Sequence, residues 1–167
     1  MENKIKLLIL DVDGVLTDGR IIFDSNGTET KFFQVLDGLG IILAKKVGIE
    51  TAIITGRSSP IIRKRCSELG ITKIYENAQD KLTALNDIKI KLNISDEEIA
   101  YMGDDLLDIC VMKKIGYAIA PSNAVQEVKA IANLITNKAG GYGAVREAIE
   151  HILKAQGTWN KAIENYT

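Results

Sequence analysis

The sequence predicts an α/β fold: a Rossmann-like parallel sheet with helices on both faces, plus a β-hairpin near the N-terminus. Short apolar runs alternate along the chain with segments of helical periodicity, which is typical of a parallel sheet with crossover helices. One pair of strand-like segments, joined through an Asn-Gly dipeptide, interrupts the alternation and indicates a hairpin. With 167 residues, 46% of them hydrophobic, the chain has the size and apolar content of one domain over residues 1–167.

The individual elements follow from this pattern. Strands are expected at 6–10, 50–54, 73–75, 99–102, 117–120 and 134–136. Helices are expected at about 38–47, 60–69, 82–92, 106–114, 124–132 and 144–156. Pro60 suits the first turn of its helix, and Gly48, Gly70 and Gly116 suit helix ends. The hairpin is expected at about 20–33, and a short C-terminal tail follows at about 157–167.

Charge and cysteine usage restrict the possible partners. The chain has 21 Lys and Arg against 22 Asp and Glu, a formal charge of −1 that gives no overall field for attracting nucleic acid or an anionic membrane. Cys66 and Cys110 lack a CxxC spacing, which favours reduced thiols. Because no secretion signal or long apolar stretch is apparent, we expect a cytoplasmic protein without nucleic-acid or membrane partners.

Polar clusters follow the expected strands at the points where those strands end. The first strand runs into DVDGVLTDG at 11–19, the second into Thr-Gly-Arg at 55–57, and the fourth into GDDLLD at 103–108. Lys81 opens the helix after the third strand. Ligands of open parallel sheets bind beyond the carboxyl ends of the strands, so these clusters are expected to form one site.

The acidic clusters point to a metal ion and a phosphate. Carboxylates from Asp11, Asp13 and Asp104 would repel one another unless a cation lies between them, and an all-oxygen site beside a phosphate suits Mg²⁺. The ion would also allow the Asp11 carboxylate to approach a phosphate dianion and attack it. Asp13 would then protonate the leaving alkoxide and later accept a proton from water.

The remaining clusters suit the transferring phosphoryl group. Thr55, the Gly56 amide and the Lys81 ammonium are expected to bind its oxygens, and Arg57 is available for a second anion. Each cluster also has an ordinary structural interpretation, since Asp104 and Asp105 could cap a helix and a lone Lys is usually solvated. The combination of four complementary clusters at one sheet edge favours a catalytic site.

These motifs resemble the haloacid dehalogenase superfamily, through DVDGVLTDG at 11–19, ITGR at 54–57, Lys81 and GDDLLD at 103–108. The hairpin, FFQVLDGLGI at 32–41 and GGYGAVREAI at 140–149 narrow the resemblance to the capless branch that contains the 3-deoxy-D-manno-octulosonate 8-phosphate (Kdo 8-phosphate) phosphatases. The resemblance implies a magnesium-dependent phosphomonoesterase that forms Kdo and phosphate through an aspartyl-phosphate, in lipopolysaccharide core biosynthesis. It also implies a homotetramer, with the hairpin joining subunits in place of a cap domain.

The resemblance assigns roles to individual residues. The magnesium ligands would be the Asp11 and Asp104 side chains and the Asp13 backbone carbonyl, with Asp105 and Asp108 in secondary positions. The substrate-binding residues would be Asp13, Gln34, Val35, Leu36, Asp37, Gly38, Gly56, Arg57, Arg65 and Lys81. Arg65 would act across a subunit boundary. Ile42 departs from the pattern, because many similar proteins carry Arg there, and Trp159 in the tail would either cover a neighbouring site or lie at a surface.

Two alternatives remain open from the sequence. A phosphatase of a nine-carbon sialic-type acid 9-phosphate would share the chemistry, but such proteins tend to carry Glu after Thr-Gly, where this chain has Arg57. A non-enzymatic phospho-receiver domain would also use acidic residues, a hydroxyl, a Lys and magnesium. Receivers place the phosphorylated Asp after the third strand, and this chain reads Tyr75-Glu76-Asn77 there.

Overall fold

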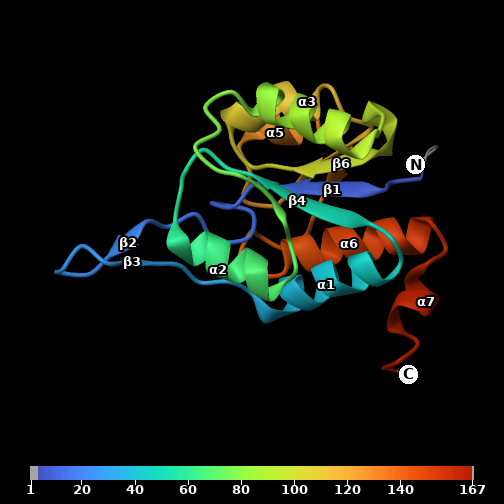
Figure 1. Ribbon diagram of the computed structural model, residues 1–167, viewed down its shortest axis with the longest axis horizontal. Coiled ribbons are helices and arrows are strands. Elements are labelled where there is room, and N and C mark those ends of the chain that lie inside the picture. The colour runs from blue at the N-terminus through green and yellow to red at the C-terminus, as the bar shows by residue number, and fades with distance from the viewer. Residues whose placement is uncertain (1–3, 167) are drawn as a thin grey trace.

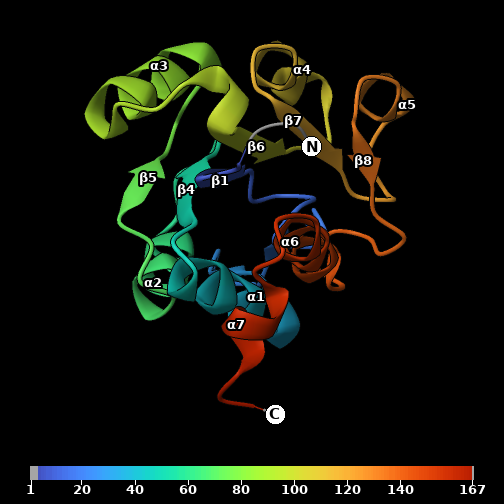
Figure 2. The same cartoon turned by 90° about the vertical axis from the view of Figure 1, so that its right-hand side faces the viewer.

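Six parallel strands form the central sheet of the computed structural model, which describes residues 4–166 (Figures 1 and 2). The strands are β1 (Leu7–Leu10), β4 (Glu50–Ile54), β5 (Lys73–Tyr75), β6 (Ile99–Met102), β7 (Tyr117–Ala120) and β8 (Leu134–Ile135). Their order across the sheet is β5-β4-β1-β6-β7-β8. Counted along the chain this is 3-2-1-4-5-6, the Rossmann order, whereas receiver domains have the order 2-1-3-4-5. The predicted fold class is therefore confirmed, and the receiver alternative is wrong in topology.

Helices cover both faces of this sheet. One face carries α1 (Val35–Lys46), α2 (Pro60–Glu68), α6 (Ala144–Ala155) and α7 (Trp159–Ile163), and the other carries α3 (Lys81–Leu92), α4 (Ile109–Met112) and α5 (Gln126–Lys129) (Figure 2). All four residues of β1 are fully buried, and they alternate between the two core clusters. Because both faces of β1 are covered by helices, all of its residues are apolar and do not alternate with polar ones. Within residues 4–166, no helix has the length and apolar character needed to cross a bilayer.

Several elements differ from the sequence-based expectation in their bounds. The helix expected at 38–47 begins at Val35, because Gln34 caps it by accepting a hydrogen bond from the Leu36 amide at 3.5 Å. The segment expected as one helix at 106–114 divides into the 3-10 helix η2 (Leu106–Asp108) and the short α4. A further 3-10 helix, η1 (Asp96–Glu98), precedes β6, and α7 was not expected. Short helices depend on tertiary packing more than on propensity, which explains these differences.

The hairpin consists of β2 (Ile22–Phe23) and β3 (Glu29–Thr30), and it projects away from the body of the molecule, beyond α2, at the left of Figure 1. Its paired segment is shorter than the expected one because only two residues of each strand pair. The Asp24 carboxylate organises the connecting loop by accepting hydrogen bonds from the amides of Asn26 and Thr28, both at 2.8 Å. Gly27 has a φ of +78°, which a glycine adopts without strain.

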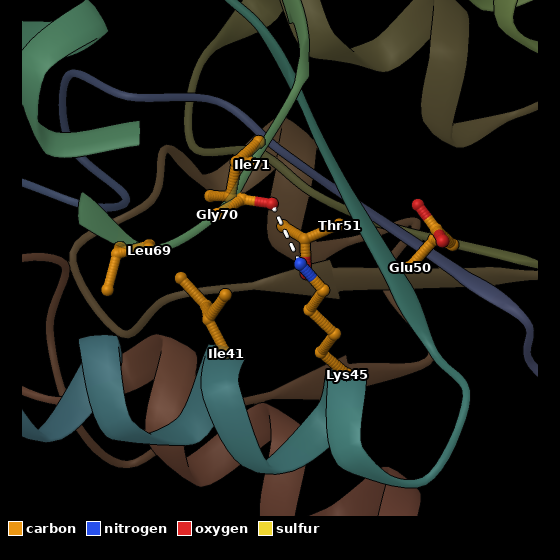
Figure 3. Close-up of a pocket in the computed structure, with 7 residues that line it drawn as sticks. All are labelled: Ile41, Lys45, Glu50, Thr51, Leu69, Gly70 and Ile71. Carbon is orange, nitrogen blue, oxygen red and sulfur yellow. Dashed lines mark hydrogen bonds between the residues drawn. The ribbon is translucent and has the colours of Figure 1, made fainter. Parts of the chain in front are cut away.

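A small hollow separates α1, β4 and the loop after α2 (Figure 3). Across it, the Lys45 ammonium donates a hydrogen bond to the Gly70 carbonyl oxygen at 3.2 Å, which joins helix and loop. The buried Thr51 hydroxyl also lines this hollow, and it has no hydrogen-bond partner within residues 4–166. Burying a hydroxyl without a partner lowers stability, so Thr51 is a position at which the native residue is not optimal.

Thr51→Val is therefore expected to leave the free energy of unfolding unchanged or to raise it by about 1 kcal/mol. Thr136→Val is the matched control, because the buried Thr136 hydroxyl donates to the Lys138 carbonyl oxygen at 2.7 Å. The control should lower the free energy of unfolding by about 1 kcal/mol, since it removes this hydrogen bond while the Lys138 carbonyl keeps the Ser122 amide as a donor at 3.2 Å. Urea denaturation of both variants measures the difference, and an equal loss in both would contradict the prediction.

Candidate active site

The carboxyl ends of β1, β4 and β6 meet at one pocket. Among its lining residues are those that the strand-end argument singled out: Asp11, Asp13, Thr55, Gly56, Arg57, Lys81, Asp104, Asp105 and Asp108. Gly19 and Leu107 complete the lining. The strand order reverses between β1 and β6, and this is where ligands bind in open α/β sheets. The structure thus brings all four predicted clusters to one place.

Lys81 lines the pocket, and its side chain is only 3% exposed. Its ammonium is 3.0 Å from Asp11 Oδ2 and 2.7 Å from Asp108 Oδ1. Burial alone would lower the pKa of Lys81, but the two carboxylates raise it above its usual value. Lys81 is therefore a fixed cation beside Asp11, which suits a group that holds phosphoryl oxygens.

Asp108 orients this lysine and the loop after β6. Its Oδ1 accepts hydrogen bonds from Lys81 at 2.7 Å and from the Tyr101 hydroxyl at 2.5 Å. Its Oδ2 accepts from the backbone amides of Asp104 at 2.9 Å and Asp105 at 3.2 Å. Both carboxylate oxygens are thus occupied, which suits a positioning role. Asp105 caps η2, as the structural interpretation of that residue expected.

The other carboxylates are crowded in a way that a bound cation would stabilise. Burial raises the pKa of Asp11 to about 6, although Lys81 acts in the opposite direction. Burial, followed by the charges of Asp11 and Asp108, raises the pKa of Asp104 to about 7. Carboxylates with such raised pKa values are costly to ionise together, and a divalent cation between them would remove that cost.

The donor set fits magnesium. One carboxylate oxygen each of Asp11, Asp104 and Asp108 lies within 4.8 Å of the others. Because hydrogen bonds already occupy both Asp108 oxygens, Asp11 and Asp104 are the side chains that would hold the ion. Of the three, Asp104 has a carboxylate to which no residue within 4–166 donates a hydrogen bond, and it is therefore available to a ligand. A Cβ atom on Gly14 would lie 1.9 Å from Asp104 Oδ2, so only glycine allows this close approach. Hard oxygen donors in such an arrangement are those that Mg²⁺ prefers.

Two residues of the hairpin, Glu29 and Lys31, contact side chains that line this pocket, and the sequence did not indicate either contact. The Lys31 side chain is 1% exposed and forms ion pairs with Asp13 Oδ1 and, at 3.4 Å, with Glu29 Oε1. Glu29 also accepts hydrogen bonds from Arg57 at 3.1 Å and Ser59 at 2.8 Å. The sequence signal that could have indicated these contacts is their spacing. Glu29 and Lys31 are two residues apart on an extended segment, so their side chains lie on the same face.

A glycine loop near the C-terminus shapes the backbone of the first acidic cluster. The Gly141 amide donates to the Val15 carbonyl at 3.0 Å, and Asn123 Nδ2 donates to the Gly14 carbonyl at 3.1 Å. The Gly140 amide in turn donates to Asn123 Oδ1 at 2.7 Å. In the sequence this glycine segment supports only the family resemblance, whereas in the structure it packs directly on the Asp-containing loop.

Comparison with known proteins decides the family. Residues 61–149 match the family model described as haloacid dehalogenase-like hydrolase. The 3-deoxy-D-manno-octulosonate 8-phosphate phosphatase KdsC of Escherichia coli (strain K12) is 48% identical over 160 residues, which are 96% of this chain and 85% of that protein. The chain belongs to this phosphatase family of haloacid dehalogenase-like hydrolases.

Solved structures agree with this assignment. The crystal structure of the Moraxella catarrhalis phosphatase of the same name, in complex with a magnesium ion, a phosphate ion and a KDO molecule, is 48% identical and has a TM-score of 0.95. The match covers 98% of this chain and 94% of that one. The Yersinia pestis phosphatase matches at 42% identity and a TM-score of 0.91, over 92% of this chain and 83% of that one. The resemblance inferred from the motifs is confirmed.

Six predicted substrate residues lie outside the lining of the pocket. They are on or beside α1 and α2: Gln34, Val35, Leu36, Asp37, Gly38 and Arg65. Val35 and Leu36 are exposed. A Cβ on Gly38 would lie 2.4 Å from Arg65 Nη2, and the Arg65 guanidinium lies 5.9 Å from the Phe33 ring centroid. These residues thus form a second group, next to the base of the hairpin, that does not line the pocket.

Asp37 is buried in a structural position. Its Oδ1 accepts a hydrogen bond from the Arg146 amide at 2.7 Å, which ties α1 to the first turn of α6, and its Oδ2 has no partner within residues 4–166. Burial raises the pKa of Asp37 to about 6, although hydrogen bonds from the Arg146 and Gly143 amides and the charge of Lys138 act in the opposite direction. The ionised carboxylate is therefore a destabilising element at neutral pH.

Asp37→Asn is expected to stabilise the protein, by about 2–3 kcal/mol at pH 7.5 and by much less near pH 4. The folded state binds the proton of Asp37 more tightly than the unfolded state, so its contribution to stability falls as the pH rises from about 4 to about 6. Urea denaturation of wild type and variant across this range measures the difference. Asp24→Asn is a control of opposite sign, because amide hydrogen bonds from Thr28 and Asn26 lower the pKa of Asp24. A pH-independent difference for Asp37→Asn would contradict the prediction.

Trp159 lies on the same face as α1 and α6. Its ring is partly buried against the core, with the Arg146 guanidinium 5.6 Å and the Lys154 ammonium 5.2 Å from the ring centroid. Within the chain the ring therefore anchors the tail on α6 through cation–π contacts. The expectation that Trp159 covers a neighbouring site stays a prediction.

Proposed function

We propose that this protein is a magnesium-dependent phosphatase that hydrolyses Kdo 8-phosphate to Kdo and inorganic phosphate, for lipopolysaccharide core biosynthesis. The observation that carries the proposal is the convergence of Asp11, Asp13, Lys81 and Asp104 on one pocket at the switch point of the sheet. Asp11 and Asp104 with the Asp13 backbone carbonyl would hold Mg²⁺. The bound ion would neutralise phosphate charge and align the phosphoryl group with Asp11.

In the first step, an Asp11 carboxylate oxygen forms a bond to phosphorus while the bond between phosphorus and the sugar oxygen breaks. Asp13 gives its proton to that departing oxygen, so the sugar leaves as a neutral alcohol. The product on the enzyme is an aspartyl-phosphate at Asp11. Thr55, the Gly56 amide and Lys81 bind the phosphoryl oxygens, where charge is spread in the transition state.

In the second step, a water molecule attacks phosphorus and gives one proton to the Asp13 carboxylate. The bond between Asp11 and phosphorus breaks, phosphate leaves, and Asp11 is again a carboxylate. Asp13 is then protonated and ready to act as the acid in the next cycle. Lys81, held by Asp108 at 2.7 Å, stays in place through both steps.

The substrate contacts include a cation and, in the proposal, a second subunit. Arg57 lines the pocket and is available to the substrate carboxylate, which supports an octulosonate. We place the group around residues 34–38 and Arg65 against the sugar of a neighbouring subunit within a homotetramer. Exposed apolar side chains at the hairpin and at the start of α1, among them Phe23, Phe32 and Val35, support such an assembly. The free thiols Cys66 and Cys110 support a reducing, cytoplasmic location.

Phosphate release from a panel of sugar phosphates, with and without magnesium, tests this function. We expect efficient release from Kdo 8-phosphate with magnesium and a loss of activity on chelation. Arg57→Glu should lower kcat/KM for Kdo 8-phosphate far more than for a nine-carbon sialic-type acid 9-phosphate. The proposal fails if the wild type prefers the nine-carbon compound or another sugar phosphate. Light scattering of the purified protein tests the tetramer separately.

A further inference from the structure

The hairpin places a buried cation, Lys31, against Asp13 of the pocket, and neither the proposed mechanism nor the strand-end motifs use it. Lys31 follows β3 directly, and its side chain is 1% exposed. Burying an ammonium group is costly unless it is paired, and the Lys31 ammonium is paired with two carboxylates, those of Asp13 and Glu29. A hairpin that served assembly alone would not require this charge next to the pocket.

The two carboxylate oxygens of Asp13 differ in their hydrogen bonding. Oδ1 accepts a hydrogen bond from the Lys31 ammonium. Oδ2 is buried and has no hydrogen-bond partner within residues 4–166, and its nearest ion-pair atom is Arg57 Nε at 3.7 Å. A carboxylate that acts first as general acid and then as general base needs one oxygen free to exchange a proton with the reacting group. It must also be held in a fixed orientation. The arrangement at Asp13 meets both requirements.

Glu29 fixes the position of the lysine itself. Its Oε1 is 3.4 Å from the Lys31 ammonium and 3.1 Å from Arg57 Nη2, and its Oε2 accepts a hydrogen bond from the Ser59 hydroxyl at 2.8 Å. Ser59 caps α2, which belongs to the sheet-bound part of the molecule. Lys31 is therefore connected through Glu29 to the rigid start of a helix, although it lies on the hairpin.

We propose that Lys31 is a positioning residue for the acid and base: it holds Asp13 through Oδ1, with Glu29 as its anchor, and leaves Oδ2 free for proton transfer. This inference rests on the proposed function, because it concerns the residue that exchanges protons with the leaving group and with water. Lys31 itself is not among the residues that line the pocket, so its role would be exerted through Asp13. The hairpin thereby serves catalysis as well as the proposed assembly.

The test compares Lys31→Met and Lys31→Arg with wild type on two leaving groups. Kdo 8-phosphate has an alkoxide leaving group that needs a proton, whereas p-nitrophenyl phosphate has a phenolate that leaves without one. For Lys31→Met we expect kcat on Kdo 8-phosphate to fall by about 10²-fold with little change in KM, because positioned proton transfer contributes this much. The burst of p-nitrophenol, which reports phosphorylation of Asp11, should change by less than about 3-fold. Lys31→Arg should recover most of the loss.

Lys73→Met is the matched control. Lys73 also pairs with a glutamate on a neighbouring strand, Glu50 at 2.8 Å, and lies outside the pocket lining. The control should behave as wild type on both substrates. If Lys31→Met does not fold cooperatively, Glu29→Gln replaces it and should show the same selective loss on Kdo 8-phosphate, to a smaller extent.

Three results would overturn the proposal for Lys31. They are an equal loss on both leaving groups, a raised KM with an unchanged kcat, and activity equal to that of wild type. Failure of the proposed function is distinguishable, because it would appear as a wild type that ignores Kdo 8-phosphate and hydrolyses another alkyl phosphate. In that case the same comparison on the accepted alkyl phosphate tests Lys31.

Discussion

Asp11→Asn is expected to lower phosphate release by about 10⁴-fold or more while leaving the fold intact. The change removes the atom that attacks phosphorus and, with it, a magnesium ligand. The fold should persist because Asn is nearly isosteric and because the carboxylate it replaces is itself difficult to ionise, with a pKa raised to about 6. Phosphate release and the thermal unfolding midpoint, measured on the same samples, check both parts of this expectation.

The stabilisation of the folded state by magnesium tests Asp11 as a metal ligand separately from its role as the nucleophile. For wild type, magnesium at about 100 times its dissociation constant should stabilise the folded state by about 2.7 kcal/mol, and Asp11→Asn should lose much of this gain. Asp87→Asn is the matched control, because Asp87 forms a surface ion pair with Lys91 on α3 and has no part in the pocket. The control should retain both the activity and the response to magnesium. Turnover of Asp11→Asn at a rate near that of wild type would exclude Asp11 as the nucleophile.

Gly140→Ala is expected to destabilise the protein by about 3 kcal/mol or more and to abolish most of its activity. A Cβ atom at this position would lie 1.8 Å from the Gly14 carbonyl oxygen, and backbone atoms cannot move aside as a flexible side chain can. The loop that carries Asp11 and Asp13 would have to shift. Denaturant unfolding and phosphate release, measured with saturating magnesium, check the two effects.

Gly27→Ala serves as the control for this glycine. Gly27 is in the hairpin loop with a φ of +78°, and a Cβ there would meet no atom within 4 Å. Its replacement should therefore cost only the backbone strain of about 1 kcal/mol and leave turnover unchanged. Similar losses for the two variants would show that the close approach at Gly140 has no special effect.

The strand-end residues of the site were predictable from the sequence. Asp11, Thr55, Lys81 and Asp104 each follow a buried apolar run or open the helix after one, and parallel strands bring their carboxyl ends to the same edge. These residues converge because the strands are parallel and end at the same edge of the sheet. The alternation of apolar runs and helical segments in the sequence predicts such strands. The magnesium-dependent phosphatase family followed from the same residues.

The hairpin contacts could not be predicted in this way. The pairing of Lys31 with Asp13 depends on the path of a short two-stranded segment, and that path is set by tertiary contacts of Glu29 with Arg57 and Ser59. Likewise, the sequence did not indicate that α1 begins at Val35 or that its first turn buries Asp37 against α6. The substrate contacts expected of the segment starting at Gln34 stay a prediction. Periodicity does not determine where a helix begins or which neighbour an individual polar side chain meets.

The contact between Gly140 and the Asp-containing loop has a consequence for synthesis of the chain. Once a ribosome has released β7, the nascent polypeptide already carries every carboxylate of the pocket, yet it lacks the glycine backbone that supports residues 14 and 15. We expect such a nascent chain to be catalytically silent, with competence arriving only as α6 closes against the sheet.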